Sequence, residues 1–149
     1  MKLYDRALVT IDQMGNELTR ERIREFCLLN CKEVYLCYIA PEHIIAGEVG
    51  HSLAVGDHGG DADVTQKHVG ALQEYVDLLA AEGIDVHGQI ITAAEYARGD
   101  AIVSLAQQLG VDLTILNFEI GGASVKAKVT QQIVARNPKM AVLVARPTT

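Results

Sequence analysis

Short apolar segments alternate along this chain with longer segments in which apolar residues recur every three to four positions. The short segments are typical of buried strands, and the longer ones are typical of amphipathic helices. Five segments have the strand pattern: Tyr4–Ile11, Val34–Ile39, Ile84–Thr92, Asp112–Asn117 and Met140–Arg146. Strands that alternate with helices form parallel βαβ units with right-handed crossovers. We therefore predict an α/β fold with an open, doubly wound five-stranded parallel sheet and helices on both faces.

Helical periodicity marks four segments. They are Glu17–Asn30, Asp63–Glu82, Asp100–Leu109 and a stretch through Val125, Val129 and Ile133 that Pro138 ends. The second has the most complete pattern, because Asp63 and Gln66 have the spacing of a capping box and Gly83 supplies a stop. The inner face predicted for it carries Val69, Leu72, Val76 and Leu79.

The segment Ala40–Ala62 does not fit this alternation. It is about twice the usual upper length of an unstructured connection in a compact domain. It contains five glycines together with His51 and His58, and His68 follows in the next predicted helix. Imidazole and carboxylate side chains in so short a span can bind a metal ion, although no pair has the spacing of a His-Glu-x-x-His site. Two interpretations are open: a metal site that includes His51, His58 and His68, and a solvent-exposed mobile lid without metal.

Length and charge limit the classes of function. The 149 residues, 49% of them hydrophobic, suffice for one domain that spans 1–149. The formal net charge of −6 argues against a broad nucleic-acid interface. No apolar run is long enough to span a membrane, and the start of the chain lacks the apolar core of a secretory signal. We therefore expect a cytoplasmic protein that binds neither nucleic acid nor membrane.

Three cysteines, Cys27, Cys31 and Cys37, lie close together in the sequence. An odd number of clustered cysteines fits reduced thiols better than a disulfide framework. Cys27 and Cys31 are four residues apart, so they can share a helical face and contribute to a metal site. Cysteine is also among the most buried residue types. Core packing is the interpretation that we favour.

The loop after the fourth predicted strand has features of an anion site. It carries Gly121 and Gly122, and Ser124 can open the following helix. In open α/β sheets, ligands bind at the carboxyl ends of strands, where the free N–H groups and the dipole of a helix attract anions. The sequence has no Gly-x-Ser-x-Gly elbow, no Walker Gly-Lys-Ser/Thr, and no Gly-x-Gly-x-x-Gly after the first strand. These patterns favour a binding protein over an enzyme.

Three segments, taken in order, resemble the universal stress protein family. Tyr4–Asp12 resembles its first strand with a closing aspartate, Gly99–Asn117 resembles its third helix and fourth strand, and Ala141–Pro147 is similar to its last strand. The resemblance implies a Rossmann-like fold of the adenine nucleotide alpha hydrolase type with strand order 3-2-1-4-5. It also implies a homodimer, commonly formed through the last strand.

Many members of that family bind ATP through Gly-x-x-Gly, nine residues, then Gly followed by Ser or Thr, after strand four. Glycines there let backbone N–H groups approach the phosphates. In this chain, counted forward from the fourth strand, Asn117 stands at the first glycine and Ile120 at the second. Counted backward from the last strand, Lys128 and Val129 stand roughly where Gly-Ser/Thr belongs. The resemblance assigns Asp12 to the adenine or ribose end, although an aspartate at this place also ends a strand and caps a turn.

The resemblance therefore implies a dimeric, non-enzymatic stress-response regulator that does not bind ATP tightly and has no resident cofactor. The alternative is an ATP sensor or slow ATPase in which Gly121, Gly122 and Ser124 form a rebuilt phosphate loop. The candidate residues for a nucleotide or anion are Asp12, Asn117, Gly121, Gly122 and Ser124.

Overall fold

The computed structural model describes residues 2–11, 17–41, 59–94, 97–117, 132–136 and 140–145. Within them the strands are β1 (Tyr4–Ile11), β2 (Cys31–Pro41), β3 (Asp85–Ala93), β4 (Leu113–Asn117) and β5 (Ala141–Ala145). The helices are α1 (Glu17–Asn30), α3 (Gly59–Ala80) and α4 (Arg98–Leu109), and residues 132–135 are also helical. No helix in these ranges is long and apolar enough to cross a membrane.

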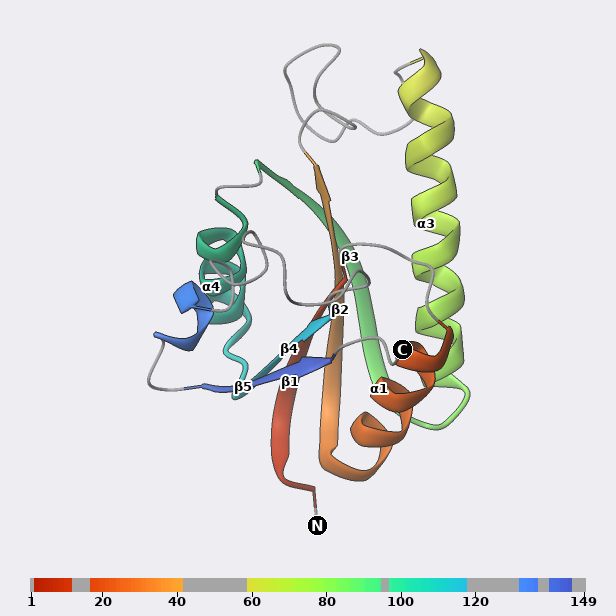
Figure 1. Ribbon diagram of the computed structural model, residues 1–149. Helices are drawn as coiled ribbons and strands as arrows, with labels where there is room; N and C mark the ends of the chain where they lie inside the picture. Colours follow the sequence, from red (N-terminus) through yellow and green to blue (C-terminus); the bar gives the residue numbers. More distant parts are fainter. Residues whose placement is uncertain are drawn as a thin grey trace.

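The five strands form one sheet in the order β3-β2-β1-β4-β5, and every neighbouring pair is parallel. This confirms the predicted fold class and strand order. Right-handed crossovers on the two sides of β1 send the helices to opposite faces of the sheet. Figure 1 shows the result, with α1 and α3 on one side of the sheet and α4 on the other.

The first face is covered by α1 and α3. Alternate positions of the strands point to it, because successive side chains of a strand point to opposite faces. The largest buried side chains that the helices contribute are Tyr75, which is 1% exposed, and Leu79, which is 0% exposed. The stripe predicted for α3 is therefore partly wrong: Val69 is 44% exposed, whereas Tyr75 belongs to the core.

The second face is covered by α4 and the helical residues 132–135. Ile102 and Leu105 of α4 and Val134 pack there against the intervening strand positions, such as Leu8. A Cβ atom on Gly99 would lie 2.9 Å from the Cβ of Ile133. The missing side chain at Gly99 therefore lets the two helical segments approach each other closely.

Both ends of the irregular segment predicted at Ala40–Ala62 belong to regular elements, because β2 extends to Pro41 and α3 begins at Gly59. Residues 42–58 lie outside the described ranges. Glycine is a poor helix former, so Gly59 and Gly60 suggested a loop. Continuing an existing helix adds a backbone hydrogen bond for each residue, which favours the extension.

Glycines mark two helix ends, and one of them, Gly83, is the predicted stop. Gly83 has φ 82°, and Gly110 has φ 67° with ψ 39°. The Gly110 N–H donates to the carbonyls of Ala106 and Gln107, which satisfies the carbonyl groups at the end of α4. β4 can therefore start at Leu113, close behind α4.

Candidate functional site

The sheet reverses its winding direction between β1 and β4. Both strands are central, and their last residues, Ile11 and Asn117, are aligned across the ladder. The Thr10 hydroxyl donates to the Ile115 carbonyl at 3.4 Å and joins the two strands just before they end. Chains that leave two adjacent strands toward opposite faces open a crevice, and ligands of open α/β sheets bind there.

Of the predicted site residues, the described ranges contain only Asn117, at this crevice. Asn117 is the last residue of β4, and its backbone is aligned with Ile11 on one side and with Ala145 on the other. Asp12 is the next residue after Ile11 in the chain, but it lies outside the described ranges, as do Gly121, Gly122 and Ser124. The strand ends that precede Asp12 and the Gly-Gly loop therefore lie side by side.

Arg98 was missed by the sequence analysis. It opens α4, and its Nη2 donates to the Ile39 carbonyl at 3.2 Å, level with the carboxyl end of the neighbouring β1. A positive charge in the first turn of a helix interacts unfavourably with the helix dipole. That unfavourable placement is the signal that could have marked Arg98 in the sequence. Its guanidinium adds positive charge at the carboxyl ends of the central strands, where ligands of open α/β sheets bind.

The predicted histidine group cannot be assembled from the described part of the chain. His51 and His58 lie outside it, and His68 lies in α3 with a side chain that is not described. Histidine and carboxylate side chains do converge elsewhere, at the amino ends of β2 and β3. Glu33, Asp85 and His87 each offer a ligand atom, and these atoms lie within 4.8 Å of one another.

The three cysteines are free and buried, which agrees with the core-packing interpretation. A hydrogen bond with Cys31 and burial raise the pKa of the Cys27 thiol, and burial raises the pKa of Cys37 to about 12. Thiols with raised pKa values stay protonated at neutral pH, whereas metal ions bind the thiolate. The hydrogen bond with Cys27 lowers the pKa of Cys31, so this argument applies to Cys27 and Cys37, whereas the burial of all three thiols agrees with core packing.

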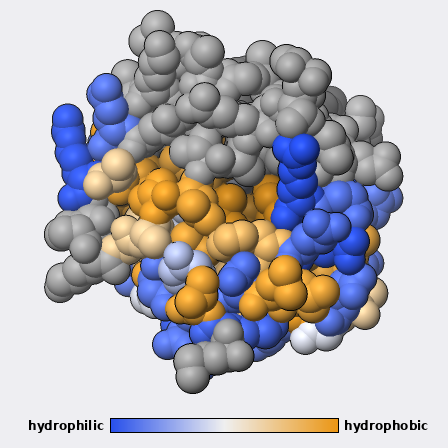
Figure 2. All heavy atoms as spheres, turned by 60° about the horizontal axis from the view of Figure 1, so that its bottom comes forward, coloured by the Kyte–Doolittle hydropathy of each residue, from blue (hydrophilic) through white to orange (hydrophobic). Residues whose placement is uncertain are grey.

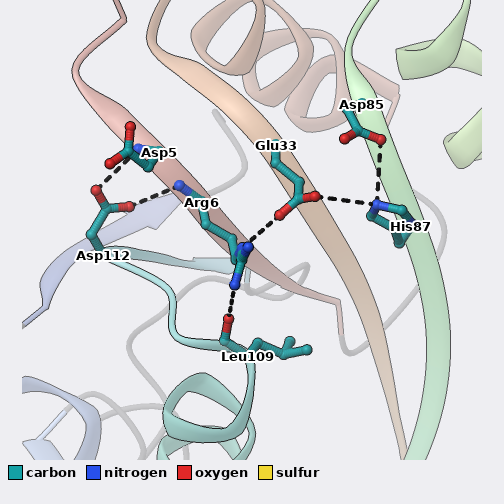
Figure 3. Close-up of polar contacts among 7 residues, drawn as sticks. All are labelled: Asp5, Arg6, Glu33, Asp85, His87, Leu109 and Asp112. Atoms are coloured by element: carbon teal, nitrogen blue, oxygen red, sulfur yellow. Dashed lines mark hydrogen bonds and ion pairs between the residues drawn. The ribbon is translucent and has the colours of Figure 1, made fainter.

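A polar network joins the amino ends of the strands (Figure 3). The Asp112 carboxylate accepts the N–H groups of Asp5 and Arg6, each at 3.0 Å. The Arg6 side chain donates to the Leu109 carbonyl at 2.6 Å and to Glu33 Oε1 at 2.5 Å. Asp112 and Arg6 thus connect β1 to the turn between α4 and β4.

Electrostatics within this network favour the ionised carboxylate of Glu33. Partial burial raises its pKa, but the hydrogen bond and charge of Arg6 and the interaction with His87 lower it further. The net result is a pKa of Glu33 below its usual value of 4.5. The same hydrogen bond with Glu33 raises the pKa of Arg6. Both groups are therefore charged at neutral pH.

The sequence analysis also missed Glu33, Asp85 and His87. The signal was available, because Asp85 and His87 are two residues apart in a strand and must share a face. What the sequence did not show is that Glu33 of β2 aligns with Asp85 of β3. Register between strands that are distant in sequence follows from the whole fold.

Comparisons with known proteins identify the fold. No family model and no curated protein matches the chain. Among solved structures, hypothetical protein MJ0577 is similar with a TM-score of 0.69 and 19% identity over 99% of both chains. A universal stress protein in complex with cAMP has a TM-score of 0.62 and 17% identity, covering 97% of this chain and 98% of its own. The universal stress protein from Archaeoglobus fulgidus in complex with dAMP has a TM-score of 0.56 and 16% identity, covering 95% and 98%. The chain therefore has the universal stress protein fold along nearly its whole length.

Proposed function

We propose that this protein is a non-enzymatic regulator of the universal stress protein type that does not bind ATP tightly. The observation that carries the proposal is the position of Asn117. The universal stress protein motif requires a glycine here, yet this residue is an asparagine whose backbone belongs to the ladder between β1 and β5. A backbone engaged in a sheet is not free to turn its N–H toward a phosphate.

The following positions support the same conclusion. Ile120 stands at the second glycine and Glu119 stands beside it. Where the motif needs positive φ, a β-branched residue costs on the order of 1–3 kcal/mol. A carboxylate near a triphosphate adds repulsion, since like charges repel.

Calorimetric titration of the intact chain with ATP tests the proposal. We expect a dissociation constant weaker than about 100 μM, equivalent to less than about 5.5 kcal/mol of binding free energy. The matched variant restores the motif with its nine-residue spacing through Asn117→Gly, Ile120→Gly, Thr130→Gly and Gln131→Ser, and it should bind ATP at least about tenfold more tightly. Micromolar ATP affinity of the unchanged protein would contradict the proposal.

A second candidate function is the binding of a nucleotide with a single phosphate. Two structures of the same fold were solved with cAMP and dAMP, and each of these ligands carries one phosphate. Gly121, Gly122 and Ser124 offer a helix start for one anion, and Arg98 adds charge at the same edge of the sheet. Nucleotide released by heating freshly purified protein, identified by chromatography, would favour this function. Protein that is free of nucleotide and does not bind AMP or cAMP would exclude it.

The proposal includes a homodimer formed through β5, which lies at the edge of the sheet. An exposed edge strand offers unpaired backbone groups to another chain. Leu143 of β5 is 39% exposed, one of the large hydrophobic side chains with the greatest exposure in the described ranges, together with Leu3, Leu29 and Val69. Figure 2 shows hydrophobic atoms exposed between hydrophilic ones on the side where the chain begins.

Sedimentation velocity tests the dimer. The substitution Leu143→Glu should weaken dimerisation at least about tenfold, because it would bury a charge without a partner. Leu29→Glu is the matched control, since Leu29 is 71% exposed on α1, away from β5. A monomeric unchanged protein, or equal effects of both substitutions, would argue against an interface through β5.

A further inference from the structure

Three potential metal ligands meet at the amino ends of β2 and β3. His87 Nε2 lies 3.3 Å from Asp85 Oδ1 and 3.5 Å from Glu33 Oε2. Figure 3 shows both carboxylates directed at the same nitrogen of the imidazole. One nitrogen and two oxygens therefore converge on one point, although the three side chains come from two strands.

The pairing of the strands brings these residues together. Arg6, Glu33 and Asp85 form one row across β1, β2 and β3, while Tyr35 and His87 are aligned in another row. The side chains share the face on which α4 lies, since Tyr35 packs against the core of that face. The two ends of α4 contact Ile39 and Arg6, so the helix crosses β2 and β1 and leaves this corner of the sheet open.

We infer that Glu33, Asp85 and His87 form a binding site for one divalent transition-metal ion of the zinc class. Zinc binds imidazole nitrogen and carboxylate oxygen at about 2.0–2.2 Å in tetrahedral geometry, which separates ligand atoms by roughly 3.3–3.6 Å. The distances of 3.3 and 3.5 Å from His87 Nε2 have this spacing. Nitrogen and oxygen donors suit zinc, whereas magnesium and calcium prefer oxygen alone. Water would occupy the remaining position.

Neighbouring residues hold two of the ligands in place. Arg6 binds Glu33 through Oε1, which leaves Oε2 directed at His87. Arg6 is itself fixed by the Leu109 carbonyl at 2.6 Å. The ring of Tyr35 stacks on the His87 imidazole with centroids 4.9 Å apart. Groups that orient ligands in this way usually strengthen a metal site by one to two orders of magnitude.

The charges also fit a cation. Two carboxylates carry two negative charges, and Arg6 offsets one of them. A zinc ion brings two positive charges, which match the two carboxylates, so the loaded site would carry the one net positive charge of Arg6. Without metal, the same arrangement would be no more than polar contacts of His87 with the two carboxylates.

The test uses untagged, chelator-treated protein and zinc alone, titrated in competition with a chromophoric chelator at neutral pH. We expect one zinc ion per chain, and His87→Gln should lower the affinity at least about tenfold. The matched control replaces the other histidines, His43→Gln, His51→Gln, His58→Gln and His68→Gln, and leaves His87 as the single histidine of the chain. This variant should retain zinc binding with unchanged stoichiometry.

Other outcomes would overturn the assignment. Failure of the unchanged protein to bind zinc would reduce the cluster to these polar contacts. Binding that survives in His87→Gln and disappears in the fourfold variant would place the metal among the other histidines. Cobalt provides an independent readout, because an intense thiolate charge-transfer band would place the metal on cysteines. Cobalt spectra with weak tetrahedral bands alone, lost in Asp85→Asn, would support the proposed ligands.

Discussion

The two faces of the sheet are covered to different extents. On the face of α1 and α3 the apolar core reaches the amino ends of the strands, where Tyr4 and Val86 pack against it. On the face of α4 the buried core begins further along, at Leu8 in β1. The preceding positions on that face are polar, with Arg6 in β1 and His87 in β3. The first face is therefore apolar along its length, whereas the second ends in a charged corner.

Apolar side chains and charged side chains contribute differently to the stability of the two faces. Burial of apolar area supplies most of the stability of a domain, and both faces contribute to it. Exposed ion pairs contribute little to stability. The charged corner has precise contacts but little burial, so selection for stability alone does not account for it. We therefore expect substitutions in the two cores to affect folding, and substitutions in the corner to affect binding.

The largest predicted effect comes from removing buried side chains on either face. Leu79 on the first face and Ile102 on the second are 0% and 1% exposed. Each substitution by alanine should lower the free energy of unfolding by about 2–5 kcal/mol, through lost burial and the cavity left behind. Urea denaturation measures the change, and Leu29→Ala, at a position 71% exposed, is the control. A small effect at only one of the two sites would show that its face is not a tightly packed core.

Gly88→Ala tests how closely α3 approaches the first face. An added Cβ would lie 2.8 Å from Val76 Cγ2, and the branched side chain of Val76 has little freedom to move away. We expect a loss of about 1–2 kcal/mol in the free energy of unfolding. The second substitution Val76→Ala should cost less in the Gly88→Ala background than in the unchanged protein. Additive costs in this double-mutant cycle would contradict the proposed close contact.

Gly99→Ala makes the corresponding test on the second face. The added Cβ would lie 2.9 Å from the Cβ of Ile133, which favours destabilisation. Alanine is also the better helix former by up to about 1 kcal/mol, and that gain offsets part of the cost. The net loss should be about 0.5–1 kcal/mol, smaller than for Gly88→Ala. Thermal and urea unfolding of both variants side by side would show whether the order is reversed.

Much of the fold could be predicted from the sequence. Helix α1 and strand β1 have the predicted bounds, because strong periodicity and clear flanks define them. Strand β2 was predicted too short at both ends, and at its amino end the reason is that Lys32 and Glu33 do not look like buried strand residues. Their place in the sheet is set by pairing with β1 and β3 on both sides. Tertiary pairing of this kind overrides local propensity.

The site was less predictable. Motif comparison placed the candidate site after β1 and β4, and of its residues only Asn117 lies in the described ranges. The corner of Glu33, Asp85 and His87 depends on the register between β2 and β3, which no local pattern records. A search for polar residues two apart within a predicted strand would have found Asp85 and His87, but not the carboxylate that joins them.

The smallest predicted effect on stability comes from the charged corner, through Glu33→Gln. The side chains of Arg6 and Glu33 are 43% and 22% exposed, so solvent screens their interaction. With chelator present, the urea midpoint should change no more than it does for Leu29→Ala. The sign of the small change is set by the pKa of Glu33, which lies below its usual 4.5. Any stabilisation by Glu33 is therefore present above the pKa that this carboxyl has in the unfolded chain. It is lost as the pH falls through the lower pKa of the folded protein.

The same substitution, Glu33→Gln, should weaken zinc binding at neutral pH by at least about tenfold. A large loss of stability without loss of zinc binding would reverse the contrast between the faces, because the corner would then be a structural element and not a binding site.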